Sequence, residues 1–297
     1  MTIRRCCLAF TTILFLLSPA RAENLFRDDA GQEVRLRAPA ARIVVLAPHI
    51  VEMLYAAGAG DRLVGAVDYS DFPAQARKLP RVGGYSRIDL EAVAALKPDL
   101  VIAWETGNDM GQVNKLKALG LTVYVSQPNT LASIADHLER LGQLAGTGAV
   151  ANPAADRFRQ RLERLRSANA NKPVVRVFYQ IWRAPLMTVG GPQIISDAMR
   201  ICGGENVFGH LRQMSPTVSV EAVLEADPEA IVATGMGEAR PEWLDDWNRW
   251  ARMTAVKRGN LFHINPDLMQ RHTPRLLDGT EKLCVDLDIV RARRTSR

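Results

Sequence analysis

Residues 89–104, DLEAVAALKPDLVIAW, join a short helical pattern to an apolar strand pattern, and this pair of elements decides the fold class. Residues 219–235, SVEAVLEADPEAIVATG, repeat the arrangement: a glutamate near the helix start, a proline seven residues later, and then an apolar run. The two glutamates lie 130 residues apart, which is too far for a solenoid repeat of about 20–50 residues. The repeat therefore predicts two similar domains, each with an acidic residue at the same place.

Other apolar runs alternate with helical patterns on both sides of these two copies. The predicted strands are residues 42–47, 63–67, 99–104, 122–127, 175–181, 230–235 and 261–265. Helical patterns separate them, for example at residues 49–57, 112–119, 131–145, 193–201 and 241–250, with a last helix from Pro274. Strands that are apolar throughout and separated by helices are typical of a parallel sheet covered on both faces. The fold class is therefore α/β, with Rossmann-like lobes.

The alternation is interrupted once in the middle of the chain. Residues 153–168, PAADRFRQRLERLRSA, form a charged amphipathic pattern with no strand immediately before it, and Asn152 before Pro153 is a start signal for a helix. Residues 25–36, LFRDDAGQEVRL, have Ala-Gly between two short alternating runs, which indicates a hairpin. We predict an N-terminal lobe at residues 23–150 that begins with this hairpin, a single linker helix at 151–172, and a C-terminal lobe at 173–297.

The first 22 residues, MTIRRCCLAFTTILFLLSPARA, have the organisation of a cleavable signal peptide. Arg4 and Arg5 precede an apolar core at residues 7–17, and Ala20-Arg21-Ala22 is a small-x-small cleavage site. The apolar core is too short to span a bilayer. Cys6 and Cys7 lie at the start of this core, whereas a lipoprotein cysteine would follow it, so we expect no lipid anchor.

Removing the signal leaves a mildly basic chain with one pair of cysteines. The remaining 35 basic and 32 acidic residues give a net charge of +3, which does not indicate nucleic-acid binding. Cys202 and Cys284 remain, and an even pair in an exported chain favours a disulfide. The alternative is two buried free thiols. The disulfide would lie within the second lobe only.

The sequence contains none of the common catalytic or metal-binding patterns. It has no G-x-S-x-G, no H-E-x-x-H, no P-loop lysine and no dinucleotide-binding glycine motif. Its five histidines show no close ligand spacing, so we predict no metal site. His272 lies on the expected cleft loop of the second lobe, where a solvated histidine is the ordinary expectation. We predict a binding protein with no catalytic residue and no cofactor, and a secreted α/β enzyme is the alternative from another functional class.

The repeated glutamates allow two interpretations. Asp89 and Ser219 are placed as N-caps, so Glu91 and Glu221 fall in the first helical turn, where a carboxylate is stabilised by up to about 1 kcal/mol. That role is purely structural. Alternatively, one acidic point on each lobe could contact two basic points on a symmetric partner. The positions alone do not decide between these interpretations.

Several segments resemble the periplasmic binding proteins of ABC importers for cobalamin, haem and iron–siderophores. They are RIVVLAPHIVEMLYAAGAGDRLVGAVDYSDFP (42–73), IDLEAVAALKPDLVIAW (88–104), CGGEN (202–206), VSVEAVL (218–224) and TPRLLDG with the following LC (273–284). The resemblance covers nearly all of the mature chain, and the cobalamin-binding branch is the most similar. It implies a class III binding-protein fold, in which a long rigid helix joins two lobes and the ligand lies in the cleft between them. It also implies a periplasmic location, and we expect a monomer.

The resemblance assigns the repeated glutamates to docking. In this family, one glutamate on each lobe contacts arginines of the dimeric membrane permease, which works with its ATPase subunits. Glu91 and Glu221 occupy these positions. They are therefore interpreted as docking residues for an ABC importer.

A corrinoid site needs wide aromatic surfaces and a few polar anchors. The candidates are Tyr69, Tyr85, Trp104 and Trp182, which lie at or just beyond the ends of predicted elements. Asp267 matches the family position that hydrogen-bonds the edge of the ligand, although a helix-capping or turn aspartate is the simpler interpretation.

Departures from the cobalamin branch keep other ligands open. Tyr85, Ser215 and Leu268 stand where that branch often has tryptophan, which allows a variant corrinoid. Haem-binding relatives use a tyrosine from the same loop as an axial iron ligand. The interval of six residues from Tyr85 to Glu91 matches the cobalamin branch instead. Haem or an iron–siderophore is the alternative ligand.

Overall fold

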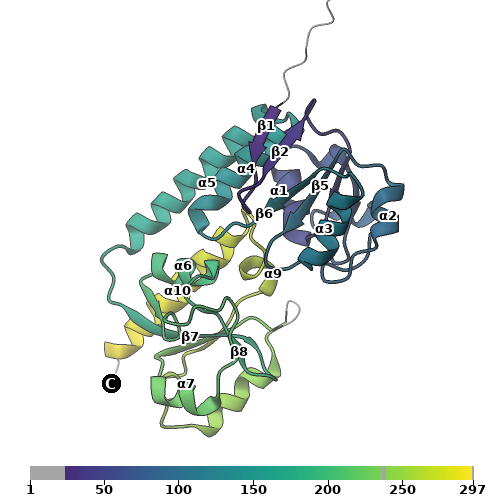
Figure 1. Ribbon diagram of the computed structural model, residues 1–297. Helices are drawn as coiled ribbons and strands as arrows, with labels where there is room; N and C mark the ends of the chain where they lie inside the picture. Colours follow the sequence, from purple (N-terminus) through teal and green to yellow (C-terminus); the bar gives the residue numbers. More distant parts are fainter. Residues whose placement is uncertain (1–23, 236–238, 296–297) are drawn as a thin grey trace, which may run out of the picture.

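The protein consists of two α/β lobes joined by the long helix α5, Gly148–Asn169 (Figure 1). The computed structural model describes residues 24–235 and 239–295. The predicted fold class, two lobes with parallel sheets and a connecting helix, is confirmed. The predicted signal peptide, residues 1–22, lies outside the described residues. Within the described ranges, no helix is long and apolar enough to cross a membrane.

The first lobe is built on a four-stranded parallel sheet in the order β4-β3-β5-β6. Its strands are β3 (Ile43–Val45), β4 (Leu63–Ala66), β5 (Leu100–Trp104) and β6 (Val123–Ser126). Its helices are α1 (Pro48–Ala56), α2 (Leu90–Ala95), α3 (Met110–Ala118) and α4 (Leu131–Ala145), with short 3₁₀ helices at Gly60–Arg62 and Ala74–Lys78. An antiparallel hairpin of β1 (Asn24–Arg27) and β2 (Glu33–Leu36) precedes them, as predicted.

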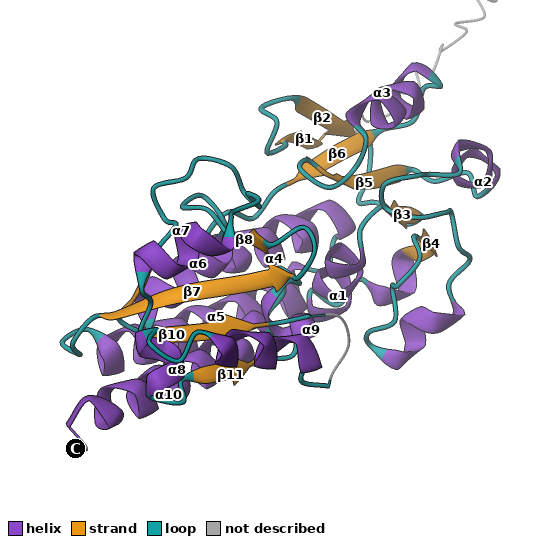
Figure 2. Ribbon diagram, turned by 90° about the horizontal axis from the view of Figure 1, so that it is seen from below, coloured by secondary structure: helices purple, strands orange, loops and turns teal. Residues whose placement is uncertain are grey.

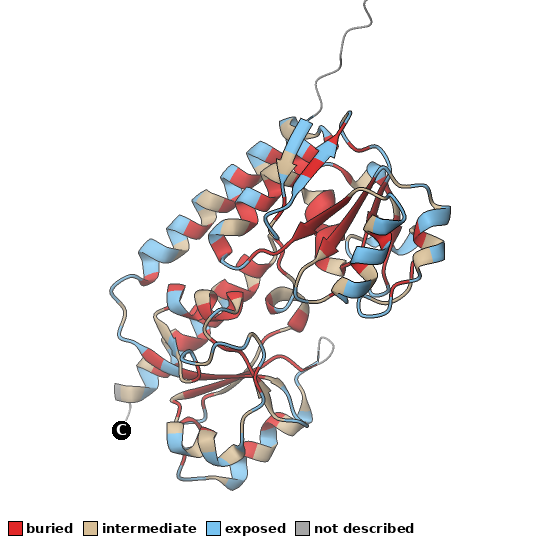
Figure 3. Ribbon diagram, viewed as in Figure 1, coloured by how far each residue is buried: buried red, intermediate tan, exposed pale blue. Residues whose placement is uncertain are grey.

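Both faces of this sheet are covered, which explains why its strands are apolar throughout. Alternate side chains enter two different clusters: Ile43, Leu100 and Ile102 lie in one, and Val44, Val101 and Ala103 lie in the other. All six are fully buried. Figure 3 shows β5 and β6 in the colour of buried residues. The absence of any polar alternation in the strands follows from this burial on both faces.

The second lobe has a five-stranded sheet with the path β11-β10-β7-β8, and β9 pairs with β7. Its strands are β7 (Val175–Trp182), β8 (Met187–Thr188), β9 (Gly204–Asn206), β10 (Ala230–Ala233) and β11 (Leu261–His263). Its helices are α6 (Ile194–Ile201), α7 (Val220–Ala226), α8 (Thr254–Lys257), α9 (Pro266–Met269) and α10 (Leu276–Thr295). Only β8 pairs antiparallel, and β7, β10 and β11 run side by side (Figure 2). Two details were not predicted: the short strands β8 and β9, and 3₁₀ rather than α-helical turns at Glu242–Arg249.

The connecting helix differs from the predicted range of 151–172. The predicted start at Asn152–Pro153 is wrong, because Pro153 lies inside α5. Gly146, in the left-handed region with φ of 70°, ends α4, and the chain turns directly into α5 through Thr147. The hydroxyl of Thr147 donates to the carbonyl oxygen of Ala57 at 2.7 Å, which fixes this turn. Pro153 removes one helical hydrogen bond, and the packing of α5 on α4 offsets that loss.

One hydrophobic core runs through both lobes. It includes residues of α1 and α4 in the first lobe, of α6 and α10 in the second, and the inner face of α5 between them. On α5, the buried apolar residues are Ala151, Ala155, Phe158 and Leu162. The connecting helix is therefore packed along its length and is not a free rod.

Cys202 and Cys284 form a disulfide with an S–S distance of 2.01 Å. Cys202 caps the C-terminus of α6, and Cys284 lies in α10. The predicted disulfide is confirmed, and it joins two helices within the second lobe.

Candidate functional site

A cavity of about 530 Å³ lies between the lobes. The first lobe contributes the loops that follow β5 and β6, and the second contributes the loop before α6, residues of that helix, and Met214 after β9. The lining residues are Glu105, Thr106, Gln127, Asn129, Thr130, Gly191, Pro192, Gln193, Asp197, Arg200 and Met214. Ligand sites of open α/β sheets lie beyond the carboxyl ends of the strands, and this cavity has that position.

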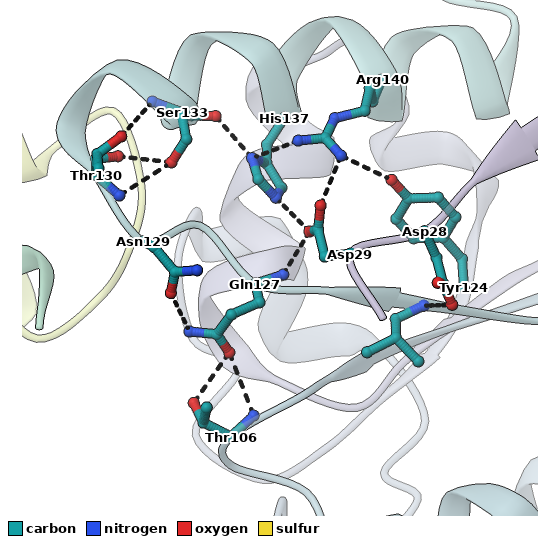
Figure 4. Close-up of polar contacts among 11 residues, drawn as sticks. Asp28, Asp29, Thr106, Tyr124, Gln127, Asn129, Thr130, Ser133, His137 and Arg140 are labelled. Carbon is teal, nitrogen blue, oxygen red and sulfur yellow. Dashed lines mark hydrogen bonds and ion pairs between the residues drawn. The ribbon is translucent and has the colours of Figure 1, made fainter. Parts of the chain in front are cut away.

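The first-lobe wall of the cavity is held by side-chain hydrogen bonds around Gln127 (Figure 4). The amide oxygen of Gln127 accepts from the Thr106 hydroxyl at 2.9 Å, and its amide nitrogen donates to Asn129 Oδ1 at 3.1 Å. The backbone N–H of Gln127 donates to Asp29 Oδ2 at 2.6 Å. These contacts fix the two loops before any ligand arrives.

Asp29 connects the N-terminal hairpin to α4 beneath this wall. His137 Nε2 and Arg140 Nη1 each lie 2.6 Å from an oxygen of its carboxylate. Burial alone would raise the pKa of Asp29, but its hydrogen bond with His137 and the charge of Arg140 lower that pKa to about 2. The hairpin that opens the described chain is therefore anchored to the lobe as an ionised, hydrogen-bonded carboxylate.

The start of α4 links the two lobes at the cavity. Thr130 and Ser133 form a reciprocal capping box, so two of the first-turn groups are satisfied within the helix. The backbone N–H of Leu131 instead donates to Asp197 Oδ2 of α6, at 2.9 Å. A carboxylate of the second lobe thus completes the cap of a first-lobe helix.

Three of the four predicted aromatic residues are exposed. Tyr69 is 75% exposed, Tyr85 44% and Trp182 39%. Tyr69 adopts a φ of 62°, which is unusual for a residue other than glycine. The indole N–H of Trp182 donates to the carbonyl oxygen of Ala184 at 3.0 Å. Such large exposed side chains indicate surfaces that become covered when something binds.

The fourth aromatic, Trp104, is partly buried beneath Tyr85. Their ring centroids are 6.2 Å apart, and the carbonyl oxygen of Tyr85 accepts from Asn108 Nδ2 at 2.6 Å. Among the described residues, neither Tyr69 nor Trp182 makes a ring contact with this pair. The structure therefore brings together two of the four predicted aromatics, on the first lobe.

A pair of buried histidines lies under Trp104. The ring centroids of His49 and His272 are 5.5 Å apart, and each ring also contacts Trp104, at 5.0 and 6.3 Å. The expectation of a solvated His272 is wrong, because this residue is 3% exposed. His49 Nε2, His272 Nδ1 and Trp104 Nε1 have no hydrogen-bond partner among the described residues. Burial, with a smaller contribution from His137, lowers the pKa of His272 from 6.5 to about 4.

Acid should destabilise the protein through His272. The pKa of His272 is about 4 in the folded protein, against about 6.5 in the unfolded chain. The unfolded chain therefore binds a proton first as the pH falls from 6.5 toward 4, and the folded state loses stability over that range. We expect the free energy of unfolding to fall by about 2–3 kcal/mol from this residue between pH 7.5 and 4.5. Urea denaturation of wild type and His272→Gln at both pH values measures it. An equal pH dependence in the two proteins would contradict the assignment.

Asp267 lies in α9 and belongs to an ion-pair cluster between the lobes. Its Oδ1 is 3.0 Å from Arg271 Nε, while Asn265, and not Asp267, caps the helix. Arg271 Nη1 also contacts Glu52 Oε1 at 2.8 Å and Asp71 Oδ1 at 2.7 Å. Glu52, Arg271 and Arg275 of this cluster were not predicted from the sequence. The spacing of two arginines four residues apart after α9 is a weak signal for such a cluster.

Glu91 and Glu221 occupy the first turns of α2 and α7 and are both exposed. The predicted caps are confirmed: Asp89 Oδ1 accepts from Ala92 N at 2.9 Å, and Ser219 Oγ accepts from Ala222 N at 3.1 Å. Figure 1 shows α2 and α7 on the outer sides of the first and second lobe. The two glutamates thus occupy equivalent places, one on each lobe.

A metal centre finds no support in residues 24–235 and 239–295. No group of three or more His, Cys, Asp or Glu side chains there could hold a metal ion.

Known proteins that are similar to this chain include periplasmic binding proteins, and the similarity extends over most of its length. A sequence model of the periplasmic binding protein family matches residues 43–268. The vitamin B12-binding protein of Vibrio cholerae serotype O1 is 40% identical over 252 residues, 84% of this chain and 90% of that protein. The solved structure of the periplasmic vitamin B12 binding protein BtuF of Vibrio cholerae has a TM-score of 0.79 at 39% identity, covering 85% of this chain and 98% of that one. A periplasmic haem-binding protein from Pseudomonas aeruginosa has a TM-score of 0.72 at 28% identity, covering 83% and 92%.

Proposed function

Because the chain belongs to the periplasmic binding protein family, we propose that it captures cobalamin or a related corrinoid in the periplasm and delivers it to an ABC importer. The observation that carries this proposal is the similarity to vitamin B12-binding proteins over more than four-fifths of the chain. The proposal assigns a binding role and no catalytic residue.

The residues assigned to the ligand do not line the cavity of about 530 Å³, so the proposed corrinoid site extends beyond that cavity. The corrin ring is wide, flat and apolar, with amide groups at its edge, and such a ligand is held by aromatic faces and a few polar groups. We assign ring contacts to Tyr69, Tyr85 and Trp182, with Trp104 supporting Tyr85 from below. Asp267 is about one-third exposed and is assigned to the amide fringe.

Delivery would use the outer surface of the protein. Glu91 and Glu221 are exposed, carry the same sign of charge and lie on different lobes. A permease dimer offers the same basic residue twice, and two equivalent acidic points match that symmetry. We therefore assign these glutamates to docking on the permease, which works with its ATPase subunits.

Haem is the second candidate ligand, and Tyr85 is the residue that favours it. Its side chain is exposed beside Trp104, and a tyrosine oxygen can serve as an axial ligand of haem iron. A tyrosine there can therefore either stack on a corrin ring or coordinate iron.

Titration of the purified mature protein with cyanocobalamin and, separately, with haemin tests the proposal. We expect one-to-one binding of cyanocobalamin by calorimetry, and equal affinity in Tyr85→Phe, because stacking needs the ring and not the hydroxyl. Tyr85→Ala should bind more weakly. Haemin binding with a tyrosinate absorbance band that Tyr85→Phe loses would transfer the protein to the haem branch, and binding of neither ligand would point to a siderophore.

A further inference from the structure

Glu52 is a buried carboxylate in the first lobe whose charged partners belong to the second. It lies in α1 and is 4% exposed. Arg275 contacts it with two hydrogen bonds, from Nε at 2.9 Å and from Nη2 at 2.8 Å, and Arg271 adds a third at 2.8 Å. These arginines lie between α9 and the start of α10, more than 200 residues further along the chain. A charge buried this completely is stable only while its partners stay in place.

The same two arginines hold the loop that carries Tyr69. Arg271 donates to Asp71 Oδ1 at 2.7 Å, and the guanidinium of Arg275 lies 3.8 Å from the ring centroid of Phe72. Burial alone would raise the pKa of Asp71, but its hydrogen bond from Arg271 lowers it, so the pair is ionised at neutral pH. The loop of residues 68–73 is therefore held from both lobes, because Arg77 and Arg81 of the first lobe also donate to its carbonyl oxygens.

The cluster also reaches a proposed ligand contact on the second lobe. Arg271 Nε is 3.0 Å from Asp267, so one guanidinium joins Glu52, Asp71 and Asp267. Moving the lobes apart would break four or more charge-assisted hydrogen bonds and would displace Tyr69 and Asp267 relative to each other.

We propose that Glu52 is a positioning residue: by holding Arg271 and Arg275, it fixes the width of the cleft and the place of the Tyr69 loop in the empty protein. This inference rests on the proposed corrinoid function. It means that the ligand-free protein already has its binding geometry. If only a fraction of the ligand-free molecules has the binding arrangement, the apparent Kd equals the intrinsic Kd divided by that fraction.

Glu52→Gln tests the inference, because glutamine keeps the shape but places an amide N–H group against an arginine donor. We expect the ligand-free variant to have a larger radius of gyration by X-ray scattering than wild type, and to contract when cyanocobalamin is added. The Kd for cyanocobalamin should rise about tenfold or more. This is the increase expected if only about one tenth of the ligand-free molecules keep the arrangement that binds the ligand. Wild type should show equal scattering with and without ligand.

Two further variants separate positioning from stability. Arg275→Gln breaks the cluster from the other lobe, leaves Glu52 paired with Arg271, and should change scattering and Kd in the same direction. Glu229→Gln is the matched control: Glu229 is partly buried and bonded twice by Arg294, but all of its partners lie in the second lobe. It should lose stability without any change in scattering or Kd.

The outcomes decide the inference separately from the ligand assignment. Wild-type scattering and Kd in both Glu52→Gln and Arg275→Gln would overturn it, whatever their melting temperatures, as would equal expansion of Glu229→Gln. If wild type does not bind cyanocobalamin, the corrinoid proposal fails. The ligand-free scattering of the variants still decides whether Glu52 holds the lobes.

Discussion

Charge reversal at both glutamates, Glu91→Arg with Glu221→Arg, is expected to abolish corrinoid uptake by cells and to leave the affinity of the purified protein for cyanocobalamin unchanged. Both carboxylates are exposed in the first turns of α2 and α7, so arginine there would repel a basic permease surface. Each reversal also loses a favourable dipole interaction of up to about 1 kcal/mol, which a folded protein tolerates.

Uptake of labelled cyanocobalamin in cells that depend on this protein measures the first effect, and calorimetry measures the second. The control variant, Glu33→Arg with Glu205→Arg, changes the net charge equally and also alters one exposed residue on each lobe. It should transport normally. A loss of affinity in the Glu91/Glu221 variant would mean that these glutamates line the ligand site, and normal uptake would remove them from docking.

Replacing both cysteines, Cys202→Ser with Cys284→Ser, is expected to lower the free energy of unfolding by about 4–5 kcal/mol. The disulfide closes a long loop, with a sequence separation of 82, so its loss frees the unfolded chain considerably. The bond joins α6 to α10 close to the start of β7, whereas Trp182, which is assigned to the ligand, lies at the other end of that strand. The variant should therefore still bind cyanocobalamin at temperatures where it is folded.

Urea denaturation of the oxidised wild type, the reduced wild type and the serine variant measures this effect. Reduction of the wild type should produce nearly the same loss as the substitution, and a reductant should have no effect on the variant. A loss below about 1 kcal/mol in both comparisons would mean that the chain-entropy account does not apply to this pair.

The fold class could be predicted because the information for it is local. Strands such as residues 100–104 are apolar throughout, and only a sheet covered on both faces gives that pattern. The repeated cap-and-glutamate pattern likewise placed Glu91 and Glu221 in first turns from neighbouring residues alone. The predicted start of α5 was wrong because it relied on a local signal. Pro153 is typical of a helix start, but the turn at Gly146 and Thr147 sets where the helix begins.

The interior of the cleft could not be predicted in the same way. Glu52 is the one acidic residue of the otherwise mostly apolar helix α1, where a carboxylate is ordinarily expected to reach the surface, and its partner Arg275 is 223 residues away. His272 was expected to be solvated for the same reason. Glu52 has apolar neighbours in Val51 and Met53, but nothing near it in the sequence identifies its charged partners, because the meeting of the two lobes brings them together. The exposure of Tyr69 and Trp182 was easier to predict, since adjacent turn residues place them at the ends of elements.

The core that passes from α1 and α4 through α5 into α6 and α10 makes the two lobes one cooperative unit. A lobe produced alone would leave the apolar face that includes Ala155, Phe158 and Leu162 without its counterpart, and would have to bury it by aggregation or by collapse. Exchange of lobes between relatives would therefore succeed only if the helices on both sides of α5 were exchanged together. We therefore expect the two lobes to fold as a single unit, although each has its own sheet.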